Sequence, residues 1–248
     1  MALSANELER YSRQILLQEL GEKGQETLKR SSVLVIGAGG VGSPCALYLA
    51  AAGIGTIGLA DGDTVALSNL HRQILYGEKD VGMAKADAAR DALRQHNSGI
   101  RINTYDRMLD FAAVKRIAEE YDFVIEAVDG MAAKIMVADA CAAAKRPHCH
   151  AGIGQFRGQV MTCLPEIGNC FSCLFEAGNG LQPVRTGTLN AACGVAGCIQ
   201  AAEAIKYLLQ SGSLLTNRVL YFDLLRNCFA AVPFCRRIRC KEKAPEHT

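Results

Sequence analysis

Apolar and polar positions follow two alternating patterns along the first 150 residues, and these patterns predict strands and helices in turn. Short apolar runs at 33–36, 57–60 and 123–127 are typical of strands that a parallel sheet buries on both faces. A further strand is expected over 100–105. The segments expected to be helical are 4–30, 44–52, 84–95, 111–120 and 132–144. Because strands and helices alternate, the expected fold class is α/β, with a Rossmann-like, doubly wound and mostly parallel sheet.

The pattern changes after about residue 150. Residues 155–163 alternate as an antiparallel strand does, so the parallel N-terminal half should continue into an antiparallel C-terminal part. A helix over 194–210 and a strand over 219–223 are expected beyond it, and the glycine-rich segment 176–188 predicts a mobile loop. We expect one domain over 1–248, with a nucleotide-binding half (1–150) and a second half (151–248).

Composition excludes several function classes. The net charge of +2 gives no reason to expect nucleic acid as a partner. Residues 31–60 carry no charge and are long enough to span a bilayer, but the glycines and Pro44 within them favour a buried strand, turn and helix, so no membrane partner is expected. The N-terminus lacks a signal pattern, which leads us to expect a cytoplasmic protein whose eleven cysteines are reduced.

A glycine motif joins the first expected strand to the helix that follows. The segment VLVIGAGGVG contains G-x-G-x-x-G, formed by Gly37, Gly39 and Gly42, with Gly40 between them. Glycine lets the backbone approach a phosphate closely, and a helix N-terminus offers free N–H groups and partial positive charge. Asp61 follows at the end of the next strand, where a carboxylate would bind ribose hydroxyls. These residues alone fit NAD, FAD or ATP, and a Rossmann dehydrogenase is the plain interpretation.

Downstream polar residues favour nucleotidyl transfer over hydride transfer. The segment DGDTVALSNLHRQ supplies Asn69, Arg72 and Gln73, and Lys85 and Asp129 come later. Attack of a carboxylate on the α-phosphate builds negative charge that Arg and Lys stabilise, together with Mg²⁺ held by a carboxylate. Asp129 follows the expected strand FVIEAV, at the sheet edge where ligands bind, and is the natural metal carboxylate.

The sequence resembles the MoeB/ThiF/HesA adenylating enzymes, which are relatives of ubiquitin-activating enzyme. The resemblance covers nearly the whole chain, and the motifs that carry it are RYSRQ, GAGGVG, DGDTVALSNLHRQ, VGMAK, VDG, CFSC and GCIQAAEAIK. It implies an adenylyltransferase that uses ATP and Mg²⁺ to activate the C-terminal glycine carboxylate of a small β-grasp sulfur-carrier protein for cofactor biosynthesis. The second half of the chain would then bind the carrier.

The same resemblance implies a role for each site residue. Asp61 would hold the ribose, Asn69, Arg72 and Lys85 the phosphates, with Gln73 nearby, and Asp129 the Mg²⁺. Arg13 resembles the arginine that such homodimers extend into the partner's ATP site, so each active site would be composite. The family usually has Asn after the metal aspartate, where this chain has Gly130.

A zinc site is also expected. Cys170 and Cys173 have the C-x2-C spacing of zinc ligands. The family completes this pair with a second C-x2-C, which here places Cys240 on the third ligand and Lys243 on the fourth. The set is incomplete as written, and Cys235 or His247 would supply the fourth ligand if zinc is bound. Loss of zinc, leaving a residual or redox-active pair, is the alternative.

No cysteine lies in the segment LQPVRTGT, where some family members carry a covalent thiol. Cys193 and Cys198 are expected to be small core residues. The chemistry inferred therefore stops at the acyl-adenylate, and a separate donor such as a cysteine desulfurase would supply sulfur. Arg157 is a candidate contact for the carrier.

Three other functions stay open at this point. The same fold adenylates small carboxylates or tRNA bases, a dehydrogenase would bind NAD instead of ATP, and a non-catalytic scaffold would keep the nucleotide site without turnover. The joint presence of Arg72, Lys85 and Asp129 argues against the last two.

Overall fold

The computed structural model describes residues 2–165, 171–174 and 187–234. Eight strands form one sheet in the order β3-β2-β1-β4-β5-β6-β7-β8. The strands are β1 (Ser32–Ile36), β2 (Thr56–Ala60), β3 (Arg101–Tyr105), β4 (Phe123–Glu126), β5 (His148–Gly154), β6 (Arg157–Cys163), β7 (Arg218–Asp223) and β8 (Cys228–Pro233). Strands β1 to β5 pair in parallel, and the pairs from β5–β6 to β7–β8 are antiparallel. The expected change from a parallel to an antiparallel half is confirmed.

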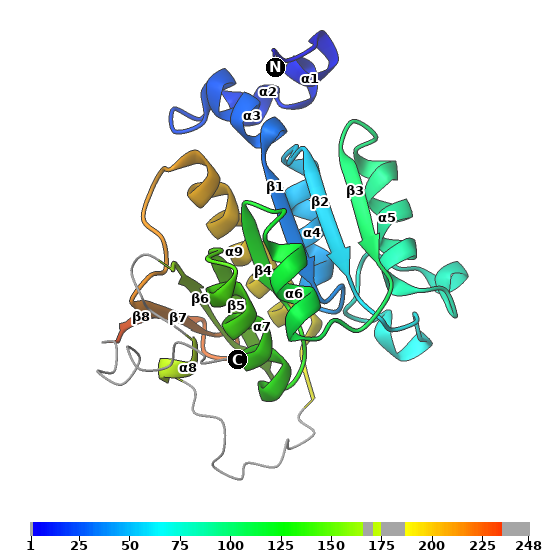
Figure 1. Ribbon diagram of the computed structural model, residues 1–248, viewed down its shortest axis with the longest axis vertical. Coiled ribbons are helices and arrows are strands. Elements are labelled where there is room, and N and C mark those ends of the chain that lie inside the picture. The colour runs from blue at the N-terminus through cyan, green and yellow to red at the C-terminus, as the bar shows by residue number, and fades with distance from the viewer. Residues whose placement is uncertain (1, 166–170, 175–186, 235–248) are drawn as a thin grey trace.

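Helices cover both faces of the sheet (Figure 1). The α-helices are α1 (Ala5–Arg10), α2 (Ser12–Ile15), α3 (Gly21–Arg30), α4 (Gly42–Ala51), α5 (Lys85–His96), α6 (Phe111–Ala118), α7 (Met131–Ala143), α8 (Phe171–Leu174) and α9 (Asn190–Leu209). Helices α4, α5 and α9 pack on one face, and α6 and α7 on the other. The switch in strand order lies between β1 and β4, and in open α/β sheets the carboxyl edge at such a point binds ligands.

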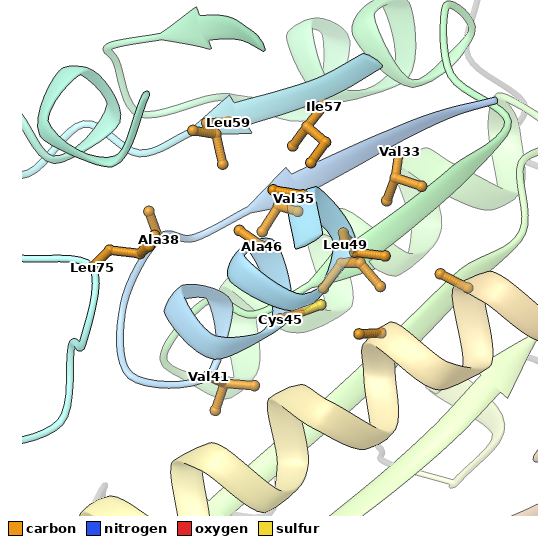
Figure 2. Packing of buried hydrophobic residues seen from close by; sticks show 14 of the residues in the cluster. Val33, Val35, Ala38, Val41, Cys45, Ala46, Leu49, Ile57, Leu59 and Leu75 are labelled. Atoms are coloured by element: carbon orange, nitrogen blue, oxygen red, sulfur yellow. The ribbon is translucent and has the colours of Figure 1, made fainter. Parts of the chain in front are cut away.

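Alternate residues of the buried strands belong to two separate cores. Val33 and Val35 of β1 point toward α4, where they meet Leu49 (Figure 2). Leu34 and Ile36 lie in the cluster on the opposite face, beneath α6 and α7. Each fully buried Leu or Ile stabilises the fold by about 1.5–3 kcal/mol relative to leaving it exposed. The uncharged segment 31–60 is therefore β1, α4 and β2 of the core, as expected.

Helix α9 is the one helix among the described residues that is long and apolar enough to cross a membrane. It packs against α4, β5 and β6, and Ala192, Ala196, Ala201 and Ala204 are buried in the core. Small side chains let α9 approach α4 closely: a Cβ on Gly197 would lie 2.4 Å from the carbonyl oxygen of Val41. Its apolar composition is explained by this central packing.

The segment 4–30, expected to be helical, is divided into three helices. These helices are α1, α2 and α3, and Gly21 begins α3 with a φ of +58°. A capping box begins α1, because the Ser4 hydroxyl accepts from the Glu7 N–H and the Glu7 carboxylate accepts from the Ser4 N–H. Tyr11 interrupts the helix because its ring is buried and its hydroxyl accepts a hydrogen bond from Asn97.

Candidate nucleotide site

The phosphate-binding candidate is the turn from β1 to α4. Gly37 has a φ of +95°, and a Cβ there would lie 2.5 Å from the carbonyl oxygen of Ala127. A Cβ on Gly42 would lie 1.8 Å from the carbonyl oxygen of Gly37. Only glycine fits either position, because both clashes are with backbone atoms. Gly39 and Gly40 lie between them. The glycine loop expected from the sequence therefore runs from the end of β1 to the N-terminus of α4.

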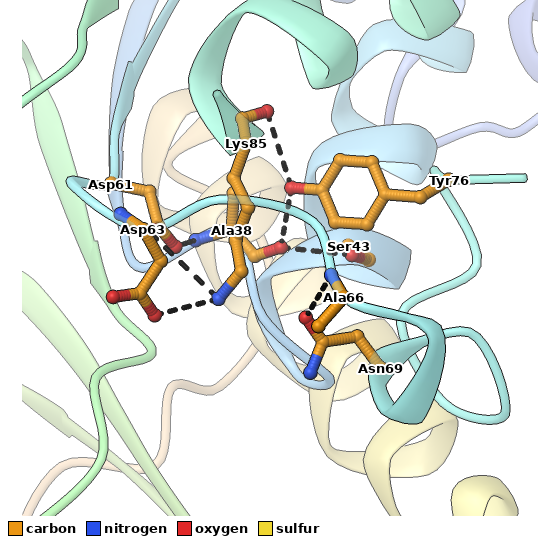
Figure 3. Close-up of polar contacts among 8 residues, drawn as sticks. All are labelled: Ala38, Ser43, Asp61, Asp63, Ala66, Asn69, Tyr76 and Lys85. Atoms are coloured by element: carbon orange, nitrogen blue, oxygen red, sulfur yellow. Dashed lines mark hydrogen bonds and ion pairs between the residues drawn. The ribbon is translucent and has the colours of Figure 1, made fainter. Parts of the chain in front are cut away.

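Side chains from distant segments hold this loop in place. The Tyr76 hydroxyl and the Ser43 hydroxyl both donate to the carbonyl oxygen of Ala38, at 2.8 Å and 3.1 Å (Figure 3). The Ala38 N–H donates to Asp61 Oδ2 at 2.8 Å. Burial raises the pKa of Tyr76 well above its ordinary value, so the hydroxyl keeps its proton. The loop is thus preorganised before any ligand is present.

Asp61 and Lys85 form the charged side of the site. Asp61 Oδ1 accepts from the Asp63 N–H at 2.9 Å, and Lys85 Nζ lies 2.7 Å from Asp63 Oδ2 and 4.0 Å from Asp61 Oδ1 (Figure 3). Burial raises the pKa of Asp61, and the backbone hydrogen bonds and the Lys85 charge offset this only in part. Lys85 itself is buried, so its charge is held against these two carboxylates.

Arg72 and Gln73 approach the glycine loop from the segment after β2. The Cγ and Cδ atoms of Arg72 would lie 3.3 Å and 3.4 Å from a Cβ on Gly40. Gln73 is 3% exposed, its Nε2 would lie 3.7 Å from a Cβ on Gly39, and its Oε1 has no hydrogen-bond partner among the described residues. A buried polar atom without a partner suits a site that a ligand completes.

Asn69 is placed less directly. Its Oδ1 accepts from the Ala66 N–H at 3.0 Å and so closes the short helix η1 (Leu67–Asn69), four residues before Gln73 (Figure 3). Arg72 Nη1 donates to the Ser68 carbonyl oxygen at 3.1 Å and lies 2.8 Å from His71 Nε2. The local role of Asn69 is therefore to shape the turn that carries Arg72.

Asp129 lies at the same sheet edge, in the turn from β4 to α7 (Met131–Ala143). It is exposed, and the preceding Ala127 packs against Gly37 of the glycine loop. Burial is the main cause that raises the pKa of the Cys193 thiol, and the charges of Arg72 and Asp129 lie near enough to lower and raise it respectively. Gly130, with a φ of +81° and open space around its Cα, follows it.

Arg13 does not join this group. Its helix α2 lies at the amino edge of the sheet, where Gln14 Nε2 donates to the Ala52 carbonyl oxygen ahead of β2 (Figure 1). The five residues of β1 alone separate the two sheet edges by about 16 Å. Arg13 is exposed at that edge and cannot act in the site of its own chain.

Cys193 is buried, as expected, and burial raises its pKa. Its Sγ would nevertheless lie 3.0 Å from a Cβ on Gly40, so it forms part of the wall of the site, a position that no sequence pattern predicts. Cys198 is half-buried, and burial raises its pKa too. Arg157 Nε donates to Asp223 Oδ2 at 2.9 Å, an ion pair that links β6 with β7, and the Arg157 side chain is 46% exposed.

The predicted zinc ligands lie almost entirely outside the described residues, and the zinc site stays a prediction. Cys170, Cys235, Cys240 and His247 lie outside the described residues, and Cys173 is in α8 without a described side chain. Within the described ranges, no cluster of three or more His, Cys, Asp or Glu residues is arranged to hold a metal ion. Asp129 offers Mg²⁺ a single carboxylate ligand. One protein carboxylate suits Mg²⁺, because this ion keeps water and phosphate ligands.

The sheet order and the glycine loop define a doubly wound nucleotide-binding protein. The chain belongs to the ThiF family, whose model matches residues 11–246. It is 44% identical over 225 residues to an adenylyltransferase and sulfurtransferase MOCS3 of Culex quinquefasciatus, covering 89% of this chain and 51% of that protein. It is 37% identical over 238 residues to the SAMP-activating enzyme E1 of Haloferax volcanii, covering 94% of this chain and 88% of that protein.

Solved structures share the fold. The crystal structure of PaaA superimposes with a TM-score of 0.81 at 28% identity, covering 94% of this chain and 75% of that chain. The crystal structure of E. coli MccB with ATP gives a TM-score of 0.83 at 25% identity, covering 96% of this chain and 74% of that chain. The chain spans about half the length of the MOCS3 relatives.

Proposed function

We propose that this chain uses Mg·ATP to adenylate the C-terminal glycine carboxylate of a small ubiquitin-like sulfur-carrier protein. The observation that carries the proposal is the convergence of the glycine loop, Asp61, Lys85, Arg72 and Asp129 on one sheet edge. Membership of the ThiF family and the names of the MOCS3 and E1 relatives support the reaction and the kind of substrate.

The reaction requires no general base. The carrier carboxylate is already an anion at neutral pH, so one of its oxygens attacks the α-phosphorus directly. The new bond joins that oxygen to the α-phosphorus, and the bond to the bridging oxygen of the β-phosphate breaks to release pyrophosphate. The result is a mixed anhydride of the carrier with AMP.

Each site residue has a role in this reaction. The N-terminus of α4 binds phosphate through the loop's N–H groups, and Asp61 faces the ribose. Arg72 and Lys85 stabilise the negative charge that grows as pyrophosphate leaves. Asp129 would hold Mg²⁺, which supplies further charge neutralisation when bound. When ATP enters, the Lys85 ammonium must leave Asp63 and contact the phosphates instead.

The active form is proposed to be a homodimer. Arg13 lies at the sheet edge opposite Asp129, so its guanidinium can serve catalysis only in a site of another copy. A partner chain that presents Arg13 to the phosphates would complete the positive side of the site.

Sulfur chemistry is proposed to lie outside this chain. The segment 181–188 has no cysteine, and Cys193 is buried with a raised pKa. A cysteine desulfurase or similar donor would convert the adenylate to a thiocarboxylate. The expected cytoplasmic location also stays part of the proposal. A structural zinc on Cys170, Cys173 and Cys240 remains part of the proposal.

The substrate is tested by mass spectrometry. The full chain is incubated briefly with Mg·ATP, pyrophosphatase and each of several β-grasp proteins ending in Gly-Gly. One carrier should gain the mass of AMP, and a copy lacking its last glycine should not. If no carrier gains AMP although Mg·ATP raises the melting temperature, the substrate is a small carboxylate or tRNA. Stabilisation by NAD but not by Mg·ATP would indicate a dehydrogenase.

A further inference from the structure

A buried charged cluster lies directly behind the turn that carries Asp129. We call Glu126, Lys134 and His150 the Glu126 cluster. Glu126 ends β4, Lys134 lies on α7, and His150 lies in β5. The side chains are 1%, 13% and 3% exposed. A carboxylate at such depth costs several kcal/mol unless it is paired, so these three residues must act together.

Glu126 contacts three different segments through its two oxygens. Its Oε1 accepts from Lys134 Nζ at 2.9 Å and from the Val128 N–H at 2.9 Å. Its Oε2 contacts His150 Nδ1. Lys134 Nζ also donates to the Ala151 carbonyl oxygen in β5 at 2.7 Å. The cluster therefore joins the end of β4, helix α7 and strand β5.

The charges within the cluster balance. Burial raises the pKa of Glu126, but the charge of Lys134 and the hydrogen bond from His150 outweigh it and hold the pKa below its ordinary value. Burial lowers the pKa of His150. The folded cluster therefore favours the Glu126 carboxylate, which lies in contact with His150 Nδ1.

The turn between Glu126 and α7 is held from both sides. On one side, Ala127 packs against Gly37 of the glycine loop. On the other side, Glu126 binds the Val128 N–H. Asp129 is the next residue, and the Lys134 N–H donates to the Gly130 carbonyl oxygen at 3.1 Å to start α7. Since Asp129 itself is exposed, its direction depends on this turn.

We propose that Glu126, Lys134 and His150 are positioning residues that fix the β4–α7 turn and so present the Asp129 carboxylate to the metal-bound nucleotide. The role of Asp129 rests on the proposed function, whereas the ordering of the turn does not. A cluster that merely holds β4, β5 and α7 together would change stability without changing the metal requirement.

The first test measures hydrogen exchange of residues 127–131 in the full chain. Glu126→Gln and Lys134→Met should each speed amide exchange there by about tenfold, because both release the turn. Lys206→Met is the matched control, since it removes another Lys–Glu pair, with Glu203, on α9. It should leave exchange at 127–131 unchanged. Unchanged exchange in all three variants would overturn the proposal, whether or not the protein adenylates anything.

The second test measures binding of ATP at increasing Mg²⁺ by calorimetry. In Glu126→Gln, the Mg²⁺ concentration for half-maximal ATP binding should rise by about tenfold, and ATP affinity without Mg²⁺ should stay within about twofold. Lys134→Arg should keep the wild-type Mg²⁺ requirement, since its guanidinium can still donate to Glu126. A melting temperature that falls with no change in Mg²⁺ requirement would show a structural role only. Absence of ATP binding in the wild type would contradict the proposed function, while the exchange result would still decide whether the cluster orders the turn.

Discussion

At the scale of single residues, the site depends on glycines whose backbone lies so close to other backbone atoms that a Cβ would not fit. Gly37 and Gly42 face backbone oxygens, whereas Gly39 has only Gln73 Nε2 nearby, at 3.7 Å from a Cβ. The four glycines look alike in the motif, but two are required for folding and Gly39 is not. This difference separates the stability of the loop from its use in binding.

Gly42→Ala should destabilise the protein by more than about 2 kcal/mol, because the new Cβ would lie 1.8 Å from the Gly37 carbonyl oxygen and neither backbone can move freely. Gly39→Ala is the matched control and should unfold in urea with a midpoint close to wild type. Any loss of ATP affinity in Gly39→Ala then reports on access to the phosphate loop alone. Equal midpoints for the two variants would contradict this view of the loop.

The placement of the glycine loop, Asp61 and Asp129 at one sheet edge was predictable, because each follows a strand, and Arg72 and Lys85 lie in short motifs between β2 and β3. The Glu126 cluster was not, although a Glu inside the apolar run FVIEAV is a visible signal. Its partners Lys134 and His150 come from other elements, and only the pairing of β4 with β5 brings them together. Cys193 was read correctly as buried, but its contact with the loop depends on how α9 packs against α4.

At the scale of elements, the sequence predicted the parallel strands β1 to β4 and the helices between them. It missed β5 and β8 for different reasons. Strand β5 reads HCHAGIG, whose histidines and glycines conceal the apolar pattern. Strand β8 forms the edge of the sheet and is exposed along its whole length, so it has no buried face to reveal it. The second half therefore depends on pairing that local pattern does not encode.

His148 makes the stability of this region depend on pH. It is 4% exposed at the start of β5, and burial lowers its pKa to about 4, with Glu126 opposing and His150 reinforcing the shift. In the unfolded chain His148 binds a proton near pH 6.5, whereas in the folded chain it does so only near pH 4. The contribution of His148 to the free energy of unfolding is therefore fully present above pH 6.5. It should fall by about 3 kcal/mol as the pH drops toward 4.

Urea unfolding at several pH values checks this expectation. His148→Gln should show a smaller loss of stability between pH 6.5 and 4 than the wild type, whatever its stability at pH 7. His150 contributes in the same direction, because burial lowers its pKa as well, so part of the slope should persist. Parallel curves for wild type and His148→Gln would contradict the assignment.

At the scale of the whole molecule, the two edges of the sheet have separate roles. The carboxyl edge gathers the candidate nucleotide residues, and the amino edge carries α2 with Arg13 (Figure 1). No single chain can bring Arg13 to Asp129. The sequence motif RYSRQ pointed to a cross-subunit arginine only through the family resemblance, and the fold supplies a geometric reason for it.

Complementation between subunits tests the composite site. Arg13→Ala and Asp129→Ala should each reduce adenylation by at least about 10²-fold, because each removes charge stabilisation from every site of a homodimer. Both residues are exposed, so the melting temperatures should stay near wild type. Mixing the two variants should restore part of the activity through one intact site per mixed dimer. A mixture as inactive as its components would exclude Arg13 from the partner's site.

ATP–pyrophosphate exchange tests the central claim most directly, because it detects reversible adenylate formation without any later sulfur step. The wild-type chain should exchange label between pyrophosphate and ATP when Mg²⁺ and one Gly-Gly carrier are present. It should not do so without the carrier, and Asp129→Ala should fall to background. Exchange that is absent with every carrier, or that survives in Asp129→Ala, would contradict the assignment of this sheet edge as an adenylation site.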